Sequence, residues 1–243
     1  EHHRKAITAV ARLHFAPTPE AQAHLLHEGV AVGDAPVVGN TVIDALWWMR
    51  KRLDGTELDH LGLPSNRMLV LLTCHRRESQ GRPMRRALDA VAQVAAARAD
   101  ELCVVVPVHP NPVVSEAVRD RLSNIPGVAL VEPLDYRTMV ALLSAGRMVV
   151  TDSGGLQEEA PALGLPVLVL REKTERPEGV AAGGVELVGT DPDAIQRGME
   201  RILDSPVSAA VGAECSSPYG DGLASARVTD ALLGRKPTQF RPE

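Results

Sequence analysis

The chain has 243 residues, 44% of them hydrophobic and 23% charged, and its formal net charge at pH 7 is −5. This length accommodates one large domain with an apolar core, and the negative charge argues against a protein that binds nucleic acid electrostatically. The three cysteines, Cys74, Cys103 and Cys215, are far apart and odd in number. They indicate neither a disulfide framework nor a metal cluster and are typical of the reducing cytoplasm. No apolar run approaches the length of a membrane span and no signal peptide is evident, so we expect a cytoplasmic protein without a membrane partner.

The first residues, Glu1-His-His-Arg4, have the character of a helix interior rather than a helix start. We therefore expect the chain to lack an N-terminal part. The patterns that follow predict a short strand at 13–16, a helix at 19–28 and a helix at 40–52 that Asn40 or Thr41 caps.

Beyond this point, short apolar runs alternate with amphipathic stretches, as in a parallel α/β sheet. The predicted strands are 68–73, 102–106, 128–131, 148–150, 167–170 and 185–188. The predicted helices are 83–98, 112–122, 136–144, 193–203 and 223–233, followed by a frayed tail from Gly234. The expected fold class is α/β, a doubly wound parallel sheet over about 37–188, which binds ligands at the C-terminal ends of its strands.

The most informative segment follows the predicted strand at 148–150 and reads Thr151-Asp-Ser-Gly-Gly-Leu-Gln-Glu-Glu-Ala-Pro161. Ser153, Gly154 and Gly155 are expected to form a tight turn before a helix, and free backbone N–H groups at such a helix start bind phosphate. Glu158 or Glu159 could turn back to accept hydrogen bonds from a sugar diol. The segment therefore indicates a nucleotide site, although a surface turn before an acidic helix start explains the same residues.

Other candidate side chains follow the remaining strands. His75 and Arg76 come after the first strand of the predicted sheet, where they could supply acid–base chemistry and diphosphate contacts; an ordinary charged loop is the alternative. His109 lies in a proline-rich turn and could be structural. Backbone groups of the turn at 132–136 could bind the edge of a nucleobase, with Tyr136 nearby, but helix capping by Asp135 explains the same residues equally well. In the charged segment 171–178, Thr174 and Arg176 could close over a phosphate held at Ser153, and residues 218–222 form a glycine-rich turn.

Taken in order, these segments closely resemble the motifs of the non-hydrolysing UDP-N-acetylglucosamine 2-epimerases, from residue 1 to about residue 233. The motifs are Gly39-Asn-Thr-Val-Ile-Asp44, His75-Arg-Arg-Glu78, Pro107-Val-His-Pro-Asn-Pro112, Asp152-Ser-Gly-Gly-Leu-Gln-Glu-Glu-Ala-Pro161, Thr174-Glu-Arg-Pro-Glu178 and Pro218-Tyr-Gly-Asp-Gly222. The resemblance implies the C-terminal, nucleotide-binding half of a GT-B fold. It divides the chain into a connecting segment at 1–36, a UDP-binding Rossmann-like domain at 37–210, and a C-terminal helix with its tail at 211–243 that returns towards the missing domain.

The resemblance also implies roles for individual residues. His75 matches the catalytic histidine, and Glu1 matches one of the two adjacent glutamates of a Pro-Glu-Glu-x-Asn-Arg segment of the family, for which we expect a catalytic role. The residues matched to UDP binding are Arg76, Leu134, Met139, Ser153, Gly154, Gly155, Glu159 and Arg176, with Leu134 and Met139 at the uracil ring. His109 matches a position that belongs to a second, regulatory substrate site in several relatives. Cys74 departs from the family, which commonly has a smaller residue before the histidine.

The function implied by the resemblance is the reversible C2 epimerisation of UDP-GlcNAc to UDP-ManNAc by elimination and re-addition of UDP. It further implies an isomerase of cell-wall polysaccharide biosynthesis, without metal or other cofactor, that is a homodimer when full length. Three alternatives stay open: a hydrolysing epimerase that releases UDP and ManNAc, a GT-B glycosyltransferase, and a UDP-binding fragment without activity. The intact Ser-Gly-Gly-x-Gln-Glu-Glu motif favours the non-hydrolysing class.

Overall fold

The computed structural model describes residues 2–206 and 217–242, and the chain divides into two compact units. The first unit comprises residues 1–48 together with 216–243, and the second comprises residues 49–215. Residues 37–48 thus lie in the first unit, whereas the boundary expected from the sequence placed them with the nucleotide-binding domain.

The second unit is built around a sheet of six parallel strands in the order β3-β2-β1-β4-β5-β6. The strands are β1 Met68–Thr73, β2 Leu102–Pro107, β3 Val128–Val131, β4 Gly146–Thr151, β5 Val167–Val169 and β6 Val185–Leu187. The central strands are almost wholly apolar and buried, as expected where helices cover both faces of a parallel sheet. The strand order reverses between β1 and β4, which creates the crevice where doubly wound sheets bind ligands.

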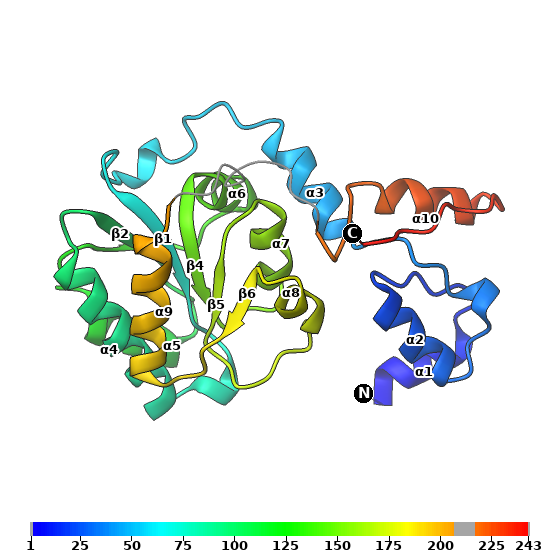
Figure 1. Cartoon of the computed structure of the whole chain (residues 1–243), viewed down its shortest axis with the longest axis horizontal. Helices are drawn as coiled ribbons and strands as arrows, with labels where there is room; N and C mark the ends of the chain where they lie inside the picture. The colour runs from blue at the N-terminus through cyan, green and yellow to red at the C-terminus, as the bar shows by residue number, and fades with distance from the viewer. Residues whose placement is uncertain (1, 207–216, 243) are drawn as a thin grey trace. The chain divides into compact units, whose positions relative to one another are not determined.

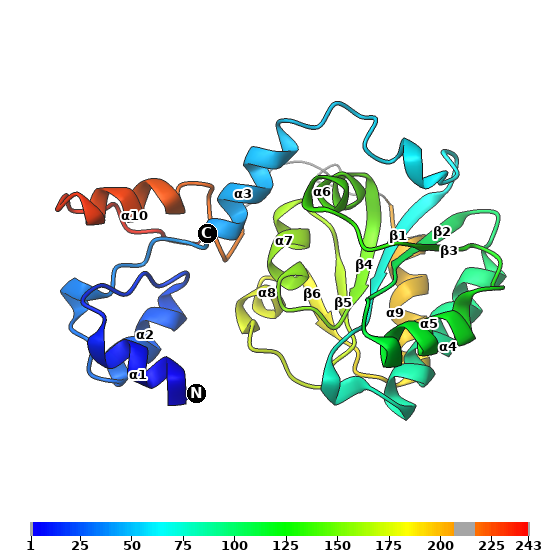
Figure 2. The same cartoon turned by 180° about the vertical axis from the view of Figure 1, so that it is seen from behind.

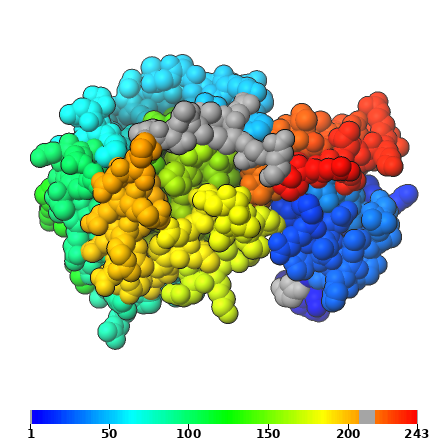
Figure 3. Space-filling model, in the orientation of Figure 1, coloured from blue at the N-terminus to red at the C-terminus, as the bar shows by residue number. Residues whose placement is uncertain are grey.

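Helices cover both faces of this sheet (Figures 1 and 2). One face carries α4 Arg82–Ala97, α5 Pro112–Leu122 and α9 Pro192–Asp204, and the other carries α6 Tyr136–Ala145, α7 Leu156–Ala162 and α8 Pro177–Ala181. The amphipathic sequence of α9 explains its place at the surface, where it is the orange helix of Figure 3. Its apolar side buries Ile195, Met199 and Ile202, while Arg197 and Glu200 are exposed.

The first unit contains α1 His2–Val10, α2 Pro19–His27, most of α3 Thr41–Arg50, and α10 Ala224–Leu232. Asp44 on α3 accepts hydrogen bonds from the N–H groups of Ala224 and Ser225 at 3.1 and 2.8 Å, so it caps α10. Gly222 has a φ of +74°, and a Cβ there would lie 2.4 Å from the Trp47 ring. Two of the sequence motifs therefore serve to hold the first unit together.

Two predictions for the first unit were wrong. Residues 13–16 form no strand; Ala16 makes only an isolated parallel bridge with Val37. The tail after Gly234 is not frayed, because Phe240 is buried against Ala16 and Val37 and its N–H donates to the Val37 carbonyl at 2.9 Å. A single aromatic residue near the end of a polar segment gave no periodic signal from which this docking could be predicted.

In the second unit, α8 was not predicted, and it begins with Pro177 directly after the charged segment. Among residues 2–206 and 217–242, no helix combines the length and the apolar character that crossing a membrane requires.

Candidate nucleotide-binding site

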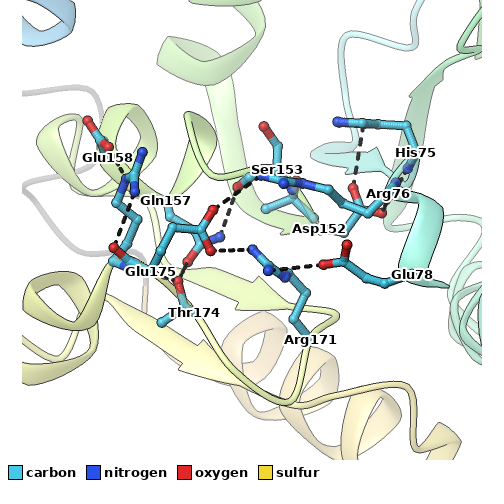
Figure 4. A network of polar contacts seen from close by, with 12 residues as sticks. His75, Arg76, Glu78, Asp152, Ser153, Gln157, Glu158, Arg171, Thr174 and Glu175 are labelled. Atoms are coloured by element: carbon cyan, nitrogen blue, oxygen red, sulfur yellow. Dashed lines mark hydrogen bonds and ion pairs between the residues drawn. The ribbon is translucent and has the colours of Figure 1, made fainter. Parts of the chain in front are cut away.

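The candidate site lies where three loops meet at the C-terminal ends of β1, β4 and β5 (Figure 4). Strands β1 and β4 are neighbours, with Thr73 paired to Thr151 at their ends. The two threonine hydroxyls lie 2.6 Å apart, and the Asp152 N–H donates to the Thr73 carbonyl at 3.3 Å. The loop that carries His75 and the turn that carries Ser153 are thus fixed side by side at the switch point of the sheet.

Asp152 connects these two loops. Its carboxylate is fully buried, and Oδ2 accepts hydrogen bonds from the N–H groups of His75 and Arg76 at 2.8 and 2.7 Å. The other oxygen, Oδ1, lies 3.5 Å from Nδ1 of His75. The structure therefore positions His75 through an aspartate to which sequence reasoning gave no role. The sequence signal from which this role could have been inferred is an acidic residue directly after the end of a buried strand.

The His75 ring also lies against His109. The two imidazoles are stacked, with their centroids 5.4 Å apart and their planes at 13°. Nδ1 of His109 accepts a hydrogen bond from the Asn111 N–H at 3.1 Å, and Asn111 in turn caps α5. The structure thus places the residue matched to a regulatory site directly beside the residue matched to catalysis.

Cys74, which directly precedes His75, is buried. Burial raises the pKa of the Cys74 thiol, and the adjacent Asp152 carboxylate raises it further. The thiol therefore stays protonated, as a donor beside the Asp152 carboxylate.

The turn after β4 presents the predicted phosphate-binding residues. The Ser153 N–H donates to the Thr151 hydroxyl at 2.8 Å, and the Ser153 carbonyl accepts from the Gln157 amide at 3.0 Å. Gln157 is held in turn by the Thr174 hydroxyl at 2.5 Å. A Cβ on Gly154 would lie 3.3 Å from the Arg76 guanidinium, a tight contact, and 3.4 Å from the Glu175 carboxylate, an ordinary one, so both side chains lie over this glycine. Arg76 and Glu175 thus cover the backbone of this turn.

The arginines around the turn are all engaged by carboxylates (Figure 4). Arg76 lies 3.4 Å from Glu175, and Arg176 forms an ion pair with the buried Glu158. Arg171 bridges Glu78 at 3.0 Å and Glu175 at 2.7 Å. Although partial burial acts in the opposite direction, hydrogen bonds and the charges of Arg171 and Arg76 hold the pKa of Glu175 below its usual value. The site thus carries the ionised carboxylate of Glu175 where a phosphate is expected.

Glu159 has a different environment from Glu158. An oxygen of its carboxylate would lie 3.8 Å from a Cβ on Gly155, so the side chain points back towards the turn. Burial raises the pKa of Glu159; a hydrogen bond from the Tyr136 hydroxyl lowers it and the charge of Glu158 raises it, with a net upward shift. Of the two glutamates, Glu158 is thus committed to Arg176 and Glu159 faces the glycine turn.

The remaining predicted residues lie at the end of β3. Asp135 caps α6 by accepting from the Thr138 N–H at 2.8 Å, which confirms the capping interpretation. Leu134 lines a pocket together with His60, Leu61 and Pro133, while Met139 is half-buried on the first turn of α6. Leu134 is therefore the better placed of the two to border a planar ligand.

Glu1 lies outside the described residues. Within the described ranges, no three His, Cys, Asp or Glu side chains converge as a metal site would need. The Asp-x-Asp triplet Asp191-Pro-Asp193 begins α9, where Asp191 accepts from the Ala194 N–H at 2.9 Å. This triplet is a helix cap.

A doubly wound sheet with a glycine turn at its switch point is the architecture of nucleotide-binding domains. A family model described as UDP-N-acetylglucosamine 2-epimerase matches residues 1–233, and the chain belongs to this family. The UDP-N-acetylglucosamine 2-epimerase of Salmonella typhimurium is 42% identical over 230 residues, which are 92% of this chain and 61% of the relative.

Solved structures agree with this assignment. The UDP-GlcNAc 2-epimerase of Neisseria meningitidis, bound to UDP-GlcNAc, is 36% identical with a TM-score of 0.87, over 97% of this chain and 65% of that one. The wall teichoic acid polymerase TagF, 14% identical with a TM-score of 0.56 over 96% of this chain and 60% of that one, shares the fold alone. The predicted α/β class and nucleotide-binding half of a GT-B fold are confirmed. The chain spans less than two thirds of the length of these relatives.

Proposed function

We propose that this chain holds the UDP part of UDP-N-acetylglucosamine at the switch point between β1 and β4, as part of an enzyme that interconverts UDP-GlcNAc and UDP-ManNAc. The observation that carries the proposal is the contact between the two strand-end loops. Asp152 holds the His75 loop against the Ser153–Gly155 turn, so one acid–base group lies beside one phosphate-binding turn. The Neisseria relative, described as bound to UDP-GlcNAc, supports this choice of ligand.

The chemistry requires a firmly held leaving group. The C2 proton of the sugar is not acidic, because no carbonyl lies beside it. A base removes this proton, the C–H electron pair forms a C1=C2 double bond, and the C1–O bond breaks with its electrons departing on UDP. Re-addition of UDP to this glycal, with a proton delivered to the opposite face of C2, gives the epimer. The elimination releases a proton and UDP and the re-addition takes up both again, so the complete reaction consumes neither.

Within this scheme, backbone N–H groups of Ser153, Gly154 and Gly155 bind the diphosphate together with Arg76 and Arg176. Glu159 accepts hydrogen bonds from the ribose hydroxyls, and Leu134 and Met139 contact the uracil ring. His75 transfers a proton as general acid or base. No metal or other cofactor has a role in this scheme.

We further propose that turnover needs the segment of the relatives to which this chain has no counterpart, because this chain spans only 61% of the length of the Salmonella relative. The division at 1–36, 37–210 and 211–243, a catalytic role for Glu1 and a regulatory role for His109 belong to the same proposal. So do a homodimer, a cytoplasmic location and a place in cell-wall polysaccharide biosynthesis.

The test is to incubate the protein with UDP-GlcNAc in D2O and to follow the sugar C2 proton and free UDP by NMR. The chain alone is compared with a chimera that carries the N-terminal segment of the Salmonella relative before residue 1. The proposal expects UDP binding by both proteins, and UDP-ManNAc with deuterium at C2 from the chimera.

Other products would identify the alternatives. UDP with free ManNAc would place the protein in the hydrolysing class, and transfer of the sugar to an acceptor without free epimer would indicate a glycosyltransferase. Binding of UDP by both proteins without any product would leave a binding module. Absence of UDP binding by either protein would contradict the site itself.

A further inference from the structure

We propose that Asp152 is a positioning residue that fixes the tautomer of His75, with the proton on Nδ1 and the lone pair of Nε2 directed to the substrate. The inference deepens the proposed function and rests on it, since it concerns the acid–base group of the same site. Three observations support it: the burial of the carboxylate, the use of Oδ2, and the direction of Oδ1.

The first two observations fix the carboxylate. Asp152 is fully buried, and Oδ2 is committed to the two backbone N–H groups of His75 and Arg76 at 2.8 and 2.7 Å. These bonds hold the aspartate in one rotamer and leave Oδ1 in one direction. Burial of an acceptor without a partner is costly. Oδ1 makes no well-directed hydrogen bond, and the Cys74 thiol, which also lies beside this carboxylate, is a second candidate donor to it.

The third observation is that a nitrogen of His75 lies beside Oδ1 of Asp152. Nδ1 of His75 lies 3.5 Å from Oδ1, slightly longer than a hydrogen bond, and such contacts tighten when substrate binds. A carboxylate can only accept in this contact, so Nδ1 must donate. In neutral imidazole the other nitrogen then carries the lone pair. When Nε2 takes a proton from the substrate, the buried negative charge stabilises the imidazolium, and the proton returns from Nε2 in the reverse direction.

His109 limits the remaining freedom of the His75 ring. Because the two imidazoles are stacked at 13°, any rotation of His75 about χ2 other than a half-turn would break the stack, and the approach of Nδ1 to Oδ1 of Asp152 distinguishes the two half-turn orientations. His109 itself has the opposite tautomer, since its Nδ1 accepts from the Asn111 N–H and its proton must therefore sit on Nε2. The stacked pair thus contains two imidazoles with opposite tautomers, each set by its own partner.

The substitution Asp152→Asn tests the assignment with little change in shape. The introduced amide can accept the two backbone hydrogen bonds only through its carbonyl oxygen, so its NH2 group must face Nδ1 of His75. A donor at this position forces Nδ1 to accept and moves the proton to Nε2. In a serine protease the same replacement in the aspartate–histidine pair lowers kcat by roughly 10⁴-fold by imposing the wrong tautomer.

The measurement is the tautomer itself, read from long-range proton–nitrogen NMR spectra of the chain labelled with ¹⁵N-histidine at about pH 8, where ordinary imidazoles are neutral. His75→Gln and His109→Gln assign the two signals. In the unmodified chain we expect the proton of His75 on Nδ1 and that of His109 on Nε2. In D152N the proton of His75 moves to Nε2, while His109 is unchanged and serves as an internal control.

A matched control is Asp191→Asn, which alters a helix-capping aspartate far along the chain and leaves both tautomers unchanged. A His75 proton on Nε2 in the unmodified chain would overturn the proposal, and this result does not depend on how any variant folds. An unchanged His75 tautomer in D152N would also overturn the proposal, if the backbone amide resonances of His75 and Arg76 keep their positions and thereby show that the loop is intact.

Activity and binding separate this inference from the proposed function. In the active chimera, D152N should lower kcat by about a thousandfold and change KM for UDP-GlcNAc little, because the diphosphate contacts are retained. The unmodified chain and D152N should bind UDP equally. If neither binds UDP, the proposed function fails, whereas the tautomers still decide whether Asp152 positions His75.

Discussion

Replacement of Glu175 by glutamine is expected to tighten UDP binding. In the structure this carboxylate lies over the glycine turn, since Oε1 would be 3.4 Å from a Cβ on Gly154 and lies 3.4 Å from the Arg76 guanidinium. Oε2 lies 2.7 Å from Arg171. Glu175 therefore occupies, with the same charge sign, the place expected for a phosphate. An incoming diphosphate must displace it and take over Arg76.

The magnitude follows from the two ion pairs that binding breaks. Both are partly exposed, since the Glu175 side chain is 44% exposed and Arg76 is 34% exposed. Pairs of this kind contribute about 0.2–1 kcal/mol each, so the two together contribute roughly 1 kcal/mol. Because about 1.4 kcal/mol corresponds to a tenfold change in affinity, E175Q should lower the Kd for UDP about fivefold.

The assay is isothermal titration of UDP into the unmodified chain, E175Q and the matched control Glu78→Gln. Glu78 shares Arg171 with Glu175, at 3.0 Å, but makes no contact with Gly154. E78Q should therefore bind UDP within about twofold of the unmodified chain. Weaker binding by E175Q would refute the reasoning, because it would mean that Glu175 orients the arginines for the phosphate. Equal tightening by E78Q and E175Q would attribute the effect to Arg171 alone.

Three further predictions concern stability and reactivity. The pKa of Glu159 is raised, so ionisation of this carboxyl group disfavours the folded state. The stability that the group contributes is present below its ordinary pKa of 4.5 and is lost as the pH rises through the raised pKa. The Tm of E159Q relative to that of the unmodified chain should therefore increase as the pH rises from below 4.5 through the raised pKa, and a constant difference would contradict the shift. Cys74, buried and with a raised pKa, should be alkylated by iodoacetamide only after unfolding, and labelling at the rate of a free thiol would contradict its burial. Asp221→Asn leaves Arg227 buried without its carboxylate, at a cost of about 2 kcal/mol in urea unfolding. The exposed pair of Asp230 makes Asp230→Asn the control, with a loss of about 0.5 kcal/mol or less.

Local patterns predicted the sheet well. Strands β1 and β3 and helix α5 begin and end at the predicted residues, because each is a run with one clear periodicity between turn residues or a proline start. The meeting of the loops after β1, β4 and β5 also followed from the sequence, since parallel strands bring their C-terminal ends to one edge of a sheet.

Pairing within the site could not be predicted in the same way. Asp152 and the His75 N–H are 77 residues apart, and no local pattern records which buried carboxylate faces which backbone group. The same holds for Arg176 with Glu158, and for Phe240, which docks on Ala16 and Val37. Contacts of this kind depend on tertiary geometry that composition and periodicity do not encode.

The most direct test of the central claim is a titration of the ¹⁵N-labelled chain with UDP, followed through the backbone amide resonances. The account predicts saturable shifts of Ser153, Gly154 and Gly155, together with those of His75 and Arg76 on the neighbouring loop. Saturable shifts confined to other parts of the chain, or no shifts at all, would contradict a UDP site at the junction of β1 and β4.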